Sequence, residues 1–122
     1  PPDPASTVGR EAVLVLGGSK SPRAADALVL FVSRHRPDAG MECDVAEALA
    51  RLRHPEALHV FLHVLERPET PPLFRRKAHD SLVRLSGRTI PADDLHAWRN
   101  WWEENHEELR WDDAAGRFTS GS

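Results

Sequence analysis

Two histidines with the spacing of a metal site are the first residues of this sequence that could do chemistry. His59 and His63 are four residues apart and Glu56 precedes them by one turn, so on a helix both imidazoles would face one ion. The sequence has no HExxH motif, leaves a third ligand unassigned, and places both histidines on the polar side of their segment. We therefore expect solvated histidines and predict neither a metal site nor another cofactor.

The candidate nucleophile for covalent catalysis also lacks a general base beside it. Cys43 is the only cysteine, so no disulfide can form within the chain, and no evident base accompanies it. The sequence contains no G-x-S-x-G, no P-loop and no dinucleotide-binding glycine pattern. We predict that the protein is not an enzyme.

Charged residues instead repeat at a fixed spacing. Glu47 and Arg51 are four residues apart, and Asp80 and Arg84 repeat the pair 33 positions later. On stacked helices these pairs would form a column of acids beside a column of arginines, a surface suited to a polar partner. The alternative is that each pair only stabilises its own solvated helix face, by about 0.2–0.5 kcal/mol.

Positive charge is concentrated at residues 75–77, in the first turn of a predicted helix, where the helix dipole favours negative charge. A docked anion or acidic partner would explain this arrangement, and solvated surface side chains are the alternative. The predicted partner-binding surface comprises Glu47, Arg51, Arg76, Lys77, Asp80 and Arg84.

Tryptophans gather near the C-terminal end of the sequence. Trp98, Trp101 and Trp102 follow the helical spacing i, i+3, i+4, and Trp111 lies beyond them. Such a face could line an aromatic cleft for a peptide or a glycan. We favour a structural cap formed by these four residues, because a helical stack needs a terminal helix with a polar outer side. Four glutamates between positions 103 and 108 supply that side.

We expect all of these residues to lie on helices, because apolar residues recur at helical spacing. No segment of useful length alternates apolar and polar residues with the period of two that is typical of a strand. Prolines and glycines mark the expected helix ends. An all-α domain over residues 7–111 follows, between a proline-rich linker at 1–6 and a tail at 112–122. We predict helices at about 7–16, 23–36, 39–53, 55–67, 73–86 and 93–109.

The predicted helices repeat in pairs. The segment 27–32 matches 57–62 at an offset of 30, and 49–52 matches 82–85 at an offset of 33. Repeats of this length indicate an α-solenoid, because one helix pair cannot bury its apolar face alone and must stack on the next pair. The two full repeat units are 22–53 and 55–87, followed by the cap at about 93–109.

The junction between these units resembles a HEAT repeat, in particular the short bacterial form. The family's A-L-x-x-L-G helix end and D-P-x-A-L helix start are matched by Ala48, Leu49, Leu52, Pro55, Ala57 and Leu58. Phe74, Arg75 and Ala78 match the opening of a second helix, whereas His54 replaces the customary acidic residue. The resemblance implies a right-handed α-solenoid of five or six helices that ends in the tryptophan-rich cap.

HEAT-repeat proteins mostly bind proteins or peptides along a concave surface lined by second helices. The resemblance therefore implies a noncatalytic interaction or assembly module of a larger protein, with a protein or peptide as its partner. The alternatives are a nucleic-acid-binding domain, an enzyme similar to the DNA glycosylases or bilin lyases with such helices, and a structural spacer. His106-Glu107 is the only His-Glu dipeptide, which excludes the di-iron hydroxylases of HEAT type.

Charge and hydropathy narrow the choice of partner. The 122 residues carry a net charge of −3, so we do not expect binding to nucleic acid. Residues 1–90 carry 13 basic and 11 acidic side chains whereas 91–122 carry 3 and 8, an asymmetry that would allow self-association. No apolar run approaches the roughly 20 residues that span a bilayer, so we expect a soluble protein without membrane insertion. Without a signal-peptide pattern the compartment stays open, with the cytoplasm favoured.

Overall fold

The computed structural model describes residues 22–35 and 38–120, and this part of the chain is mostly helical. The helix expected at 7–16 and the linker at 1–6 lie outside the described residues. The five described α-helices are α2 (Pro22–His35), α3 (Ala39–Arg51), α4 (Glu56–Glu66), α5 (Pro72–Ser86) and α6 (Leu95–Asn105). The predictions for α2 to α5 are confirmed to within two residues at each end.

Local side-chain chemistry sets most of the helix ends. The carboxylates of Asp38 and Asp94 accept hydrogen bonds from the backbone amides three residues later, at 2.8 and 3.1 Å, which caps α3 and α6. α5 begins at a proline and ends before Gly87, whose φ of 72° is the left-handed conformation typical of a helix C-terminus. α3 ends two residues earlier than expected because Arg53 also adopts a positive φ, 58°, which turns the chain toward α4.

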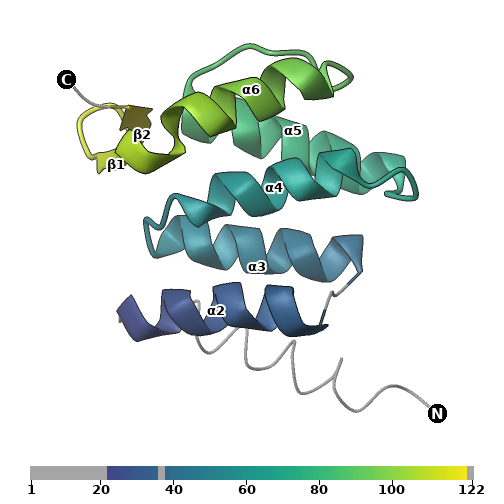
Figure 1. The fold of residues 1–122 in the computed structure, drawn as a ribbon, viewed down its shortest axis with the longest axis horizontal. Coiled ribbons are helices and arrows are strands. Elements are labelled where there is room, and N and C mark those ends of the chain that lie inside the picture. Colours follow the sequence, from purple (N-terminus) through teal and green to yellow (C-terminus); the bar gives the residue numbers. More distant parts are fainter. Residues whose placement is uncertain (1–21, 36–37, 121–122) are drawn as a thin grey trace.

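α2, α3 and α4 lie side by side in chain order and alternate in direction (Figure 1). α3 packs on α2 and α4, and α4 packs on α5. Alternate helices also touch, because α3 contacts α5 and α4 contacts α6. The fully buried large apolar side chains that hold these helices together are Leu28, Leu49, Leu58, Phe61, Leu62, Leu65, Leu82 and Trp98.

The C-terminal end differs from the prediction. The helix expected to reach residue 109 ends at Asn105, and the 3₁₀ turn η1 (His106–Glu108) leads into a hairpin of β1 (Leu109–Asp112) and β2 (Arg117–Ser120). The expectation of a tail from residue 112 is therefore wrong, because Phe118 is 1 % exposed and contacts the Trp111 ring edge-to-face. Strands of four residues are too short for their alternation to stand out in the sequence.

None of the helices within 22–35 and 38–120 combines the length and the apolar character needed to cross a bilayer. The mostly helical fold class is thus confirmed for the described residues, with the C-terminal hairpin as an addition.

Candidate functional site

The packing of α3 on α5 brings part of the predicted partner-binding surface together. Arg51 and Arg84 line one hollow of about 350 Å³ with Glu47. Trp111 and Gly116 of the hairpin complete its wall, and we name it the arginine hollow. Its remaining lining residues are Ala50 and Leu85.

The charges of this surface pair differently from the predicted columns. Glu47 forms its ion pair with Lys77 across the two helices, at 3.0 Å, and not with Arg51 four residues along. The hydrogen bond from Lys77 to Glu47 raises the pKa of the lysine ammonium. Within the described residues, neither Arg51 nor Arg84 forms an ion pair with an acidic side chain, and Asp80 forms none either.

Trp111 belongs to the arginine hollow rather than to the buried tryptophan cluster. It is half-buried, its Nε1 donates to the Asp113 carboxylate at 2.9 Å, and the Arg53 guanidinium lies 5.6 Å from its ring centre. These contacts fix the indole beside the two arginines, where it offers a rigid apolar surface next to positive charge.

The cluster at 75–77 divides into residues with different roles. The Arg75 guanidinium donates hydrogen bonds to the carbonyls of Leu65, Arg67 and Thr70, at 3.0, 2.7 and 3.2 Å. It therefore satisfies the C-terminal end of α4, where a positive charge is favourable, with three of its five N–H donors. Arg76 is exposed, and its side chain forms no hydrogen bond or ion pair within the described residues.

The tryptophans of α6 are part of the core. Trp98, Trp101 and Trp102 are 0, 9 and 6 % exposed, which leaves no aromatic cleft for a peptide or glycan. The Trp98 Nε1 donates to the Pro91 carbonyl at 3.0 Å, and its ring meets Trp101 edge-to-face. Trp102 stacks between the imidazoles of His59 and His106.

The two histidines of α4 bind separate carboxylates. His59 Nδ1 lies 2.5 Å from Glu56, and His63 Nδ1 lies 2.6 Å from Glu42 on α3. Among the residues that the structure describes, no three histidine, cysteine, aspartate or glutamate side chains gather where a single ion could bind them. The geometry thus gives these histidines protein partners in place of a shared ion.

Cys43 lies in the core, with no exposed surface. Burial raises the pKa of its thiol to about 11, so the thiolate that nucleophilic attack requires is scarce at neutral pH.

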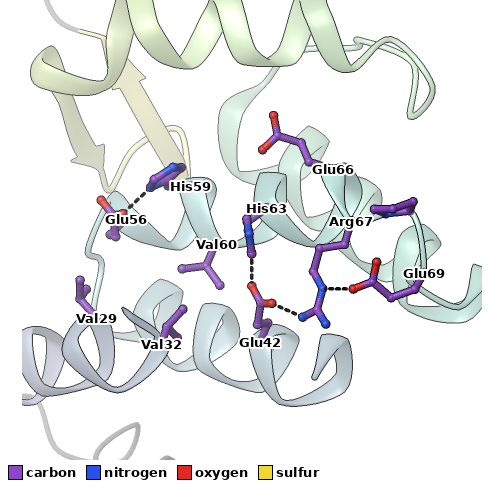
Figure 2. Close-up of a pocket in the computed structure, with 11 residues that line it drawn as sticks. Val29, Val32, Glu42, Glu56, His59, Val60, His63, Glu66, Arg67 and Glu69 are labelled. Atoms are coloured by element: carbon purple, nitrogen blue, oxygen red, sulfur yellow. Dashed lines mark hydrogen bonds and ion pairs between the residues drawn. The ribbon is translucent and has the colours of Figure 1, made fainter. Parts of the chain in front are cut away.

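A larger groove that sequence reasoning missed lies between α2 and α4 (Figure 2). It has a volume of about 710 Å³ and brings α2 valines, a buried glutamate of α3 and the outward side of α4 to one surface. We name it the valine groove. Its lining residues are Val29, Val32, Glu42, Glu56, His59, Val60, His63, Glu66, Arg67, Pro68 and Glu69. The polar repeat at 56, 59, 63 and 66 was its only sequence signal.

Comparison with known proteins finds no match for this chain among models of protein families, curated proteins or solved structures.

Proposed function

We propose that this domain is a noncatalytic helical-repeat module of the HEAT type that binds an acidic segment of a protein partner in the arginine hollow. The observation that carries the proposal is the convergence of Arg51 and Arg84 on one hollow with no acidic side chain of the described chain paired to either. An acidic side chain from a partner would supply the missing counter-charges, and the fork of an arginine suits a carboxylate.

The helix packing supports the repeat architecture. Contacts between alternate helices, α3 with α5 and α4 with α6, are those expected when successive helix pairs stack into two layers. α6 would then close the stack, because its three indoles are buried while Glu103 and Glu104 are exposed. A chain that is stacked in this way would use the α3 and α5 layer as its binding surface.

A protein partner fits better than nucleic acid. The positive charge of the hollow is local, because Lys77 is neutralised by Glu47 and the chain as a whole carries −3. Nucleic-acid binding needs a row of cations along several phosphates. Two arginines beside one indole fit a single acidic side chain with an apolar neighbour.

The proposal is tested with a blocked hexapeptide in which leucine and glutamate alternate. Its binding is monitored through the NMR signal of the Trp111 indole. We expect this peptide to shift the Trp111 signal at low salt. The shift should weaken in 0.5 M salt, because at that salt concentration charges are screened from one another beyond a few ångströms. Arg84→Glu should weaken binding about tenfold or more, the size of one lost charge pair.

Arg34→Glu is the matched control, because it changes the charge equally on α2, which does not line the arginine hollow. Equal binding by the Arg84 and Arg34 variants would refute the assignment of the site. A DNA oligonucleotide that binds more tightly than the peptide, with a steep salt dependence, would favour the nucleic-acid alternative.

A further inference from the structure

The shape and lining of the valine groove fit a side chain that is apolar along its length. Val29 and Val32 of α2 are only half-buried, and they face Val60 of α4 across the groove (Figure 2). The groove volume of about 710 Å³ lies within the range of roughly 300–1,000 Å³ that is usual for ligand sites. Val60 is only 5 % exposed, so the apolar surface open to an occupant is mainly that of Val29 and Val32.

The polar lining of the groove is predominantly acidic. Arg67 lies between two acids, since it pairs with the buried Glu42 and its Nε donates to Glu69 at 2.9 Å. Arg99 reaches over from α6 and donates to Glu66 at 2.9 Å. The two guanidinium groups therefore stand against four carboxylates, those of Glu42, Glu56, Glu66 and Glu69.

Glu56 contacts His59 and pairs with no arginine or lysine of the described residues. A carboxylate only accepts hydrogen bonds, so the proton of the His59–Glu56 contact is on His59 Nδ1. The Arg99 guanidinium lies 3.4 Å from the other nitrogen of this imidazole, Nε2. Neither of the two guanidinium groups, those of Arg67 and Arg99, pairs with Glu56, so a cation of an occupant can reach this carboxylate.

We propose that the valine groove binds a basic peptide segment, with the aliphatic stem of a lysine or arginine on the valines and its charged end at the carboxylates. Lysine and arginine bury their methylene stems on apolar surface while the cationic end contacts polar groups. The partly exposed Glu56 and the exposed Glu69 are the carboxylates nearest to solvent for that end. This site is independent of the arginine hollow, since the two share no lining residue and attract opposite charges.

The probe for this site is a blocked hexapeptide that alternates leucine and lysine. In methyl-detected NMR we expect it to shift the signals of Val29, Val32 and Val60, while the matching leucine and glutamate peptide leaves them in place. Removing two carboxylates with Glu56→Gln and Glu69→Gln should weaken binding of the lysine peptide about tenfold. Glutamine keeps the size of both side chains, so far-UV circular dichroism should be unchanged.

The control carries Glu104→Gln and Glu108→Gln, which remove the same charge from exposed positions that do not line the groove. This variant should bind the lysine peptide as the wild type does. The proposal is overturned if the two double variants weaken binding equally, or if the lysine peptide moves none of the three valines at about 1 mM. Valine shifts that depend on protein concentration without peptide would also overturn it, because a second copy would then occupy the groove.

Discussion

Replacing Arg75 by methionine should destabilise the domain far more than the same change at Arg76. The Arg75 guanidinium donates three hydrogen bonds to the carbonyls of Leu65, Arg67 and Thr70, at 3.0, 2.7 and 3.2 Å. These carbonyls belong to the end of α4 and the turn after it, and of the three only the Arg67 carbonyl also accepts from a backbone amide, that of Thr70, at 3.3 Å. Methionine fills much of the space but leaves the three acceptors without the donor.

The size of the effect follows from these contacts. A net contribution of about 1 kcal/mol for each hydrogen bond gives a loss of about 3 kcal/mol. That is a large part of a typical stability of about 5–15 kcal/mol. For a domain of this size it corresponds to a fall in melting temperature of roughly 10–15 °C. The change at the exposed Arg76, which removes the same charge, should stay within about 0.5 kcal/mol.

Urea and thermal denaturation followed by circular dichroism measure both variants under the same conditions. Arg75→Lys separates charge from geometry, because it keeps the positive charge near the α4 terminus but has no planar fork to reach three carbonyls. We expect the lysine variant to recover only a minor part of the loss. The reasoning is refuted if the two methionine variants melt at the same temperature.

The remaining predictions concern three buried side chains. The Cys43 thiol should resist iodoacetamide in the folded protein at pH 8, because it is fully buried with a pKa of about 11. The pKa of this thiol is near 9 in the unfolded chain and about 11 in the folded protein, so the free energy of unfolding should fall as the pH rises from 9 to 11. The fall should exceed that of Cys43→Ala by at most about 2–3 kcal/mol. The same pH dependence of urea denaturation in both proteins would contradict this. Trp98→Ala should cost about 3–5 kcal/mol in urea denaturation, since it empties a fully buried site and removes the donor to Pro91; a loss below about 1 kcal/mol would mean that α6 is not part of the core. Phe118→Ala should likewise lower the free energy of unfolding by about 3 kcal/mol or more, whereas the control Thr119→Ala should change it little. Equally small losses in both variants would favour the interpretation of residues 112–122 as a tail.

The helices were predictable because their signals are local. Asp38, Gly87 and the proline that starts α5 each act on the backbone within four residues of their own position, so reading along the chain is enough to find them. The hairpin was not predictable in this way. Its two buried side chains are Leu109 and Phe118, which are nine positions apart in a polar segment and therefore form no detectable period.

Side-chain partners were less accessible to sequence reasoning. Glu47 and Arg51 have the spacing of an ion pair within a helix, yet Glu47 bonds to Lys77 because α5 packs on α3. Arg75 and Arg76 are adjacent arginines, but only Arg75 reaches the carbonyls at the α4 terminus, whereas Arg76 forms no hydrogen bond or ion pair within the described residues. An ion pair between residues four apart on one helix contributes only a few tenths of a kcal/mol, so a charged side chain can pair instead with a better-placed partner on another helix.

The limits of α2 to α5 could be predicted from the sequence alone to within two residues, because helix ends depend on the chemistry of residues a few positions apart. Tertiary structure alone decided that Arg51 and Arg84 meet Trp111, and that α2 and α4 enclose the valine groove. Those arrangements depend on distances between helices, which are set by the size and fit of core side chains along the whole stack. No spacing within one segment encodes such a distance.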